Sequence, residues 1–462
     1  MRNRRMKKST EQDENVSSLQ LKLSRDFYWK KLVRYLGASP LDNLLFAIWD
    51  VRQAQTQRNW QPKFIQNLHP QQAAAKIGDS QYFYPWCLET LANLAMESSP
   101  ASAAGTTRFL DLRNVRALIS VWRALRRFED ADEGLSLQRT EVKKQLFRLT
   151  RRQFEWQQGF WNAPRLLLYL RIFGGENARR AFITKHGVSL EDFIKFGFAV
   201  AATLNHNFRI QKQFDGSAIG IASETRDKCW PLLSATPEQH RVRVTKNRSL
   251  NPARSYSPSI FRNHPCVDFG STVISPLVEC IYSRISDGLY YDVVHDGGAA
   301  DEIGKKFEEY LISILRKKSG ATQIVGEFKY GSPDRHSPDI FVVANGHVPL
   351  VIEAKSKRLN ARARFDEAPI DNKQADFEAI AKGCVQLWRF LQDSFDGKIL
   401  GQPSANESTK LLLVCLDQWV GPEAGLDNSL LFMAHMLADK LDISQSTQVR
   451  KKVHFATVAD IQ

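Results

Sequence analysis

The sequence predicts an α+β protein with more than one domain: a mostly α-helical N-terminal domain followed by a domain in which a central mixed sheet is flanked by helices. The chain has 462 residues, more than one ordinary domain contains, and 43% of them are hydrophobic, which is enough for sizeable cores. Apolar residues recur at three- and four-residue spacing through residues 21–214, as in amphipathic helices. After residue 298, helical patterns alternate with short apolar strands, which predicts helices on both faces of one sheet.

The same patterns set the expected domain boundaries. Residues 1–20 are basic and then polar, which predicts a disordered basic tail before the helical domain of residues 21–214. Residues 215–297 are expected to form an irregular connector with a short helix, and residues 241–244 a short strand. The helices expected before the connector cover residues 26–35, 41–53, 115–128, 139–157, 164–173 and 190–204.

The final domain, residues 298–462, has the most regular pattern. Its expected elements, in order, are a helix (299–318), three strands (323–330, 339–344 and 348–355), a helix (372–395), a strand (410–416), a helix (427–440) and a short strand (452–456). This order predicts a three-layer arrangement around one sheet.

Composition bounds the partners. The formal net charge of +14 favours nucleic acid or an anionic membrane, although a solvated basic surface explains it equally well. The longest nearly apolar run, residues 196–204, is too short to span a bilayer, so we expect no membrane association. The first residues lack the apolar core of a secretion signal and the six cysteines are scattered, which predicts a cytoplasmic protein with reduced thiols and no zinc cluster.

Arginine clusters occur along the helical domain, and the second of them has aromatic neighbours. Arginines interleaved with aromatic residues can hold phosphates and stack bases. The more ordinary interpretation places the arginines on wet helix faces and the aromatics in the core. The clusters are Arg123, Arg126 and Arg127; Arg148, Arg151 and Arg152 with Phe154, Trp156, Phe160 and Trp161; and Arg179 with Arg180.

The strongest chemical signal is a hairpin in the final domain. Ser337-Pro338-Asp339 opens one apolar strand, and Glu353-Ala354-Lys355 ends the next. Two carboxylates and a lysine at the mouth of a buried hairpin are costly to desolvate unless a divalent cation lies between the carboxylates. Glu353 and Lys355 are two residues apart on a strand and so share a face.

The hairpin loop decides whether Asp339 also shares that face. Asn345-Gly346 favours a two-residue turn, but that loop would pair Ala344 with His347 and put Asp339 and Glu353 on opposite sides. A three-residue loop would make them diagonal neighbours, about 7–8 Å apart at Cα. We therefore predict a three-residue loop, or a bulge that restores the phase.

Each residue of this group then has an expected role. Asp339 and Glu353 would bind Mg²⁺, or Mn²⁺ in its place, because carboxylate oxygens suit such hard cations. Lys355 would stand near the attacking water and the scissile phosphate and offset developing charge.

Further candidates lie on the flanking helices and loops. Glu308 falls on the apolar stripe of its helix, where it would be either a further metal ligand or a boundary carboxylate paired with a lysine, whereas Glu309 falls on the wet face. Gln386 could hydrogen-bond a water or phosphate near Lys355, or be an ordinary surface amide. Asp334 and His336 are expected in a loop, with His336 most simply solvated.

These residues resemble the PD-(D/E)xK nuclease superfamily over residues 298–462, with Gly304-x-x-Phe307-Glu308 similar to the first helix of its Mrr-like and Holliday-junction-resolvase-like branches. The resemblance implies a restriction-endonuclease-like domain that hydrolyses DNA phosphodiesters, less often RNA, with Mg²⁺. It implies Asp339, Glu353 and Glu308 as ligands and Lys355 as the catalytic lysine. A role in bacterial anti-phage defence or restriction is compatible with the family.

The sequence leaves open two alternatives to the endonuclease hypothesis. One is a nucleic-acid-binding protein on a nuclease fold that cleaves nothing, and the other is a protein assembly module with an incidental basic face. The expected partner is nucleic acid, with double-stranded DNA first, and the helical domain would select the substrate or contact a protein partner or a second copy. The sequence contains no P-loop, Gly-x-x-x-x-Gly-Lys-Ser/Thr, so any ATP-driven motor would be another chain.

Overall fold

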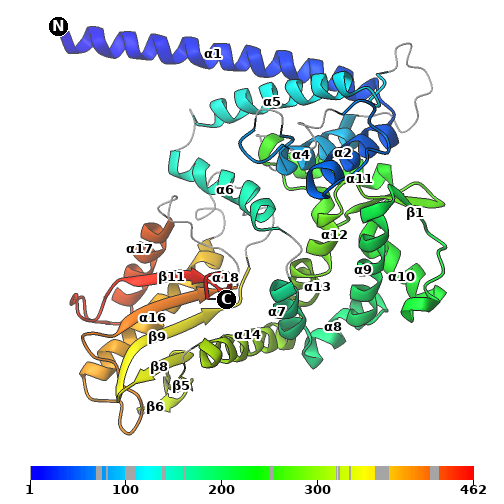
Figure 1. Ribbon diagram of the computed structural model, residues 1–462. Helices are drawn as coiled ribbons and strands as arrows, with labels where there is room; N and C mark the ends of the chain where they lie inside the picture. The colour runs from blue at the N-terminus through cyan, green and yellow to red at the C-terminus, as the bar shows by residue number, and fades with distance from the viewer. Residues whose placement is uncertain are drawn as a thin grey trace. The chain divides into compact units, whose positions relative to one another are not determined.

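The protein is α+β and divides into two compact units (Figure 1). The computed structural model describes residues 2–68, 75–79, 82–98, 110–137, 142–159, 163–249, 254–318, 320, 323–331, 335–358, 374–416 and 426–461. The first unit comprises Met1–Gln145, Arg151–Asn162 and Ile183–Leu289, and the second comprises Leu146–Thr150, Ala163–Phe182 and Tyr290–Gln462.

The first unit is mostly helical and carries a small four-stranded sheet of order β1-β4-β3-β2. Its strands have two or three residues each, too few to produce a periodic signal, and the sequence did not predict them. Its main elements are α1 (Arg2–Gly37), α2 (Leu41–Thr56), α4 (Pro85–Ser98), α5 (Val115–Leu137), α9 (Leu190–His206), β1 (Arg209–Gln211), α10 (Ser223–Leu233), β2 (Ser234–Ala235), α11 (Pro237–Ser249), β3 (Cys266–Asp268), β4 (Thr272–Ile274) and α12 (Glu279–Arg284).

Two sequence-based expectations for this unit are wrong. Residues 2–20 lie in α1 rather than in a disordered tail, and this stretch is free of the glycine and proline that interrupt helices. Residues 241–244 lie in α11 rather than in a strand. A capping box begins that helix: the Gln239 amide donates to Thr236 Oγ1 at 3.2 Å, and the Thr236 amide donates to Gln239 Oε1 at 3.0 Å.

The connector expected at residues 215–297 is also structured. Residues up to Leu289 belong to the first unit, and α13 (Tyr290–Val293) begins the second. In the other direction, α7 (Ala163–Phe173), which the sequence assigned to the helical domain, belongs to the second unit. It packs on α14 (Gly297–Lys318), with the Arg171 guanidinium 5.8 Å from the centre of the Tyr310 ring.

The second unit contains the mixed sheet that the sequence predicts, with five strands in the order β11-β10-β9-β8-β5. The single strand expected at residues 323–330 is wrong, because it divides into β5 and β6, which belong to different sheets. The neighbours β5, β8 and β9 run antiparallel, and β9, β10 and β11 run parallel. The strands are β5 (Gln323–Gly326), β8 (Ile340–Ala344), β9 (His347–Lys355), β10 (Lys410–Cys415) and β11 (Val453–Thr457), and β6 (Lys329–Tyr330) pairs separately with β7 (Arg335–His336). The helices that follow β9 are α16 (Gln374–Phe395), α17 (Leu426–Asp439) and the short α18 (Val458–Ile461).

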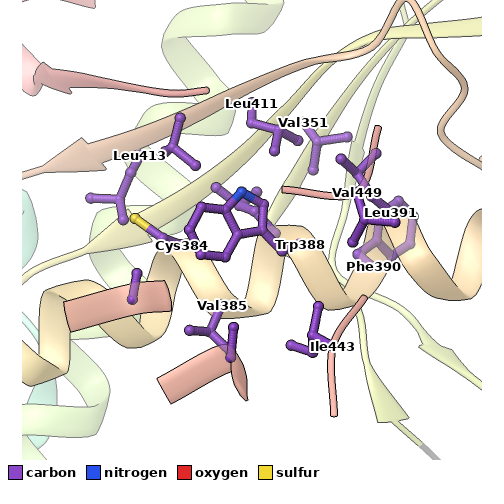
Figure 2. Close-up of a cluster of buried hydrophobic side chains, with 14 of the residues drawn as sticks. Val351, Cys384, Val385, Trp388, Phe390, Leu391, Leu411, Leu413, Ile443 and Val449 are labelled. Atoms are coloured by element: carbon purple, nitrogen blue, oxygen red, sulfur yellow. The ribbon is translucent and has the colours of Figure 1, made fainter. Parts of the chain in front are cut away.

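Helices cover both faces of this sheet. On one face, Val351, Leu411 and Leu413 pack against Cys384 and Trp388 of α16 (Figure 2). On the other face lies α14, because a side chain on Gly326, which pairs with Ile340, would contact Ile312 of α14 at 3.5 Å. Since side chains alternate along a strand, odd-numbered residues of β8, and of β9 from Val351 onward, face α16, and Asp339, Glu353 and Lys355 belong to that face.

Candidate metal centre

The β8–β9 hairpin is closed by a two-residue turn and contains a bulge. Asn345 and Gly346 have φ of 52° and 75°, and Ala344 pairs with His347. The next pair is Val342 with Leu350, so β9 contains one extra residue, at Val348-Pro349. The three-residue loop is therefore wrong, and the bulge offered as its alternative restores the phase. Ile340 pairs with Ile352, and extending this antiparallel register by one residue places Asp339 opposite Glu353.

Asp339 lies at the open end of the hairpin, where the residue two before it and the adjacent strand β9 hold it in place. Ser337 is buried, its Oγ accepts from the Phe328 amide at 2.9 Å, and its own amide donates to the Phe328 carbonyl at 2.9 Å. Asp339 Oδ2 accepts from the Ala354 amide at 2.6 Å, which fixes the carboxylate against β9. Burial raises the pKa of Asp339 to about 6, and the charge of Glu327 adds to this rise. The Ala354 amide and Lys355 act in the opposite direction and lower the pKa.

Glu353 is the most deeply buried member of the group, with 1% of its surface exposed. Its Oε1 accepts from Lys355 Nζ at 2.7 Å, whereas its buried Oε2 makes no hydrogen bond in the described part of the chain. Burial first, and then the charge of Asp339, raise the pKa of Glu353 to about 8. A buried carboxylate oxygen without a partner is costly, and a cation would relieve that cost.

Lys355 joins the sheet to α16. Its Nζ donates to Glu353 Oε1 at 2.7 Å and to Gln386 Oε1 at 2.9 Å. Burial lowers the pKa of Lys355, but Glu353 and Asp339 outweigh burial, and the net pKa lies above its usual value. The ammonium is thus charged and held by two acceptors. Gln386, for which the sequence allowed either a site residue or an ordinary surface amide, contacts this lysine.

Gly383 allows α16 to approach this closely. A Cβ at this position would lie 2.7 Å from Leu413 Cδ1, 3.0 Å from Lys355 Cε and 3.3 Å from Glu353 Cγ. A side chain here would displace either the helix or the lysine. The sequence showed the glycine in a helical run, but its contacts depend on the packing of α16 against β9 and β10.

Glu308 and Glu309 differ as the helical pattern predicts. Glu309 is exposed and pairs with Lys306 at 3.0 Å. Glu308 is half-buried, and burial, then Asp339 and Glu327, raise its pKa to about 7. Glu308 therefore lies in the electrostatic field of Asp339 rather than on the open face of α14.

Glu327 is a member of this group that sequence reasoning missed. It follows β5, its Oε1 lies 2.7 Å from His336 Nδ1, and its charge raises the pKa of both Asp339 and Glu308. The loop expected at His336 is wrong, because the residue lies in β7; its side chain is exposed, as expected, but has this partner. Asp334 lies outside the described residues.

The carboxylates of this group can be compared with the ligands that a metal ion needs. Within the described ranges, no group of three or more His, Cys, Asp and Glu side chains is arranged to hold one. The pair Asp339 and Glu353 nevertheless fits Mg²⁺, which is usually bound through one or two carboxylates and keeps several waters. The unpartnered Oε2 of Glu353 is the atom that most needs such a ligand.

The arginine clusters separate into buried and exposed groups. Arg148, Arg151 and Arg152 are buried, and Arg152 pairs with Glu129 and Glu133, so the second cluster is part of the protein interior. Its neighbour Trp156 is also buried and donates to Glu89 at 2.7 Å. The side chain of Phe154, and Phe160 and Trp161 as a whole, lie outside what the structure describes. Exposed arginines are Arg123, Arg127, Arg179 and Arg180.

Comparison with protein-family models, curated proteins and solved structures gives no match to this chain. Across the described residues, no helix has both the length and the apolar character needed to span a membrane. The site must therefore be interpreted from its own chemistry.

Proposed function

We propose that the second unit is a Mg²⁺-dependent nuclease of the PD-(D/E)xK type, on a restriction-endonuclease-like sheet. One observation carries the proposal: Glu353, buried with an unpartnered oxygen, shares a sheet face with Asp339 and Lys355 at the end of the hairpin. A binding surface gains nothing from three such groups, because each is costly to bury.

The roles follow from the contacts. Asp339 and Glu353 would hold the cation, with Glu308 close enough to add its charge. The bound cation would polarise the phosphate and make water a better nucleophile. Lys355, held by Glu353 and Gln386, would present a fixed positive charge to the phosphate as negative charge develops there. Nucleic acid, with double-stranded DNA first, is the substrate that this chemistry and the net charge of +14 favour.

The test is conversion of supercoiled plasmid by the full-length protein in Mg²⁺. We expect nicking or linearisation that stops in EDTA. Asp339→Ala should abolish it, because one of two ligands is lost. Lys355→Ala should slow it about 10²–10³-fold, the usual effect of removing one group that stabilises transition-state charge.

Two neighbours outside the site, Glu309 exposed and Lys357 partly exposed, provide matched controls. Glu309→Ala and Lys357→Ala remove the same charges from ion pairs with Lys306 and Asp376 respectively, and should leave cleavage unchanged. Cleavage that survives both Asp339→Ala and Lys355→Ala would refute the site. If plasmid is bound but no form cleaves it or a matching RNA, the rival interpretation, binding on a nuclease fold without cleavage, would replace this one.

A further inference from the structure

A cleft of about 690 Å³ lies in the first unit, within the size range of ligand sites. Its walls come from α1, from the segment before α4 and from α5. On α5 the lining residues recur every three or four positions, from Ile119 to Asp130, so they form one helix face. The residues that bear on its chemistry are Tyr28, Lys31, Tyr84, Arg123, Arg126 and Arg127.

The cleft has positive charge that the described part of the chain does not neutralise. Lys31, Arg123 and Arg127 make no ion pair with any described residue. Of the two lining carboxylates, Asp130 lies 3.9 Å from Arg126, and Asp79 accepts from the Lys76 amide at 2.7 Å within its own turn. Arg123 and Arg127 are four residues apart on α5, where like charges repel by a few tenths of a kcal/mol. This arrangement favours an anionic ligand.

Aromatic rings lie beside these charges. The Tyr84 ring stacks on Trp86 at 4.8 Å and carries the Arg126 guanidinium at 5.2 Å on its face. Tyr28 is half-buried and lines the same cleft, and its ring forms a T-shaped pair with that of Phe27, with the centroids 5.1 Å apart. Tyr28 thus places an aromatic ring in the wall of the cleft, with Lys31 three residues further along α1.

We propose that this cleft binds single-stranded nucleic acid, with phosphates on Lys31, Arg123 and Arg127 and a base on Tyr28. Stacking on an aromatic side chain requires a base that has left the duplex, which favours a single strand over double-stranded DNA. The groups read no base edges, so binding is tolerant of sequence. The proposal involves only the first unit and stands independently of the nuclease site.

The test is fluorescence anisotropy of a labelled thymidine dodecamer, with full-length Asp339→Ala protein in EDTA so that cleavage cannot interfere. Tyr28→Ala should weaken binding about tenfold, the scale of one base stacked on one aromatic ring, and Tyr28→Phe should restore it. Lys31→Gln and Arg127→Gln should each lower the slope of log affinity against log salt by about 0.7, one phosphate contact on a single strand.

An adjacent residue on the same helix is the control. Lys30→Gln alters an exposed side chain that does not line the cleft and should leave affinity and slope unchanged. Equal losses in Lys30→Gln and Lys31→Gln would reduce the effect to general surface charge and overturn the proposal. So would equal binding of an abasic strand, tighter binding of a duplex through the same residues, or full competition by thymidine monophosphate at the concentration of the strand.

Discussion

Asp339→Asn is expected to raise the free energy of unfolding of the metal-free protein by about 3 kcal/mol at pH 8 while abolishing Mg²⁺-dependent cleavage. The ordinary pKa of an aspartate is 3.8, and burial, aided by Glu327, raises that of Asp339 to about 6. The folded state therefore pays to ionise this group. Asparagine removes the charge and keeps an oxygen for the Ala354 amide, which now donates to Asp339 Oδ2.

The pH dependence of this gain has a definite sign. Because the folded pKa exceeds the unfolded one, the folded state binds the proton more tightly, and it loses stability as pH rises from 3.8 to about 6. The advantage of Asp339→Asn should thus be full above about pH 6, fade as the pH falls from about 6 to 3.8, and be absent below that. Urea unfolding in EDTA across this range measures it, with Glu309→Gln as the exposed control. A variant less stable than the parent at pH 8 would contradict the strained-carboxylate account.

Gly383→Ala and Gly304→Ala are expected to shift stability in opposite directions, although both glycines are helical. A Cβ at Gly304 would meet Ser356 Oγ at 3.7 Å, an ordinary contact, so alanine should stabilise by about 0.5–1 kcal/mol through helix propensity. At Gly383 the new Cβ would lie 2.7 Å from Leu413 Cδ1 and 3.0 Å from Lys355 Cε. Overpacking of this kind typically costs about 1–3 kcal/mol, which outweighs the gain in propensity.

Substitution by alanine should also affect cleavage differently at the two glycines. Gly383→Ala would displace Lys355 from Glu353 and Gln386, and cleavage should fall more than stability alone explains. Gly304→Ala should leave cleavage at the parental rate, because no site residue moves. Thermal unfolding and plasmid nicking on both variants provide the comparison. Equal activity in the two variants would show that the close approach of α16 is not needed for the site.

Much of the second unit could be predicted because its signals are local. The strands around Asp339 and Glu353 and the helices before and after them follow from periodicity, and the structure has them within a few residues of the expected bounds. Which side chains of the hairpin share a face was only partly predictable. Asn345-Gly346 indicated the two-residue turn, but with that turn alone Asp339 and Glu353 would lie on opposite faces. The bulge that brings them to one face could have been predicted from Pro349, which has no amide to donate to a neighbouring strand.

What could not be predicted depends on contacts between distant segments. Glu327 follows a short strand and has no motif, so its effect on Asp339 appears only when β5 pairs with β8. The attachment of α7 to α14 likewise depends on tertiary packing, which periodicity cannot assign to one unit or the other. The helix of residues 237–249 is different, since Thr236 and Gln239 already carried a capping-box signal that the alternating Arg-Val pattern obscured.

The most direct test of the central claim is calorimetric titration of Mn²⁺ into the parental protein and Asp339→Asn, with Glu309→Gln alongside. The titration measures metal binding and does not depend on cleavage, so the absence of a trigger or partner needed for cleavage cannot hide the result. We predict saturable binding that Asp339→Asn weakens by more than about 100-fold, beyond the loss typical of an outer-shell change, and that Glu309→Gln leaves intact. Equal binding by all three proteins, or no binding by the parental protein, would contradict a metal centre at Asp339 and Glu353.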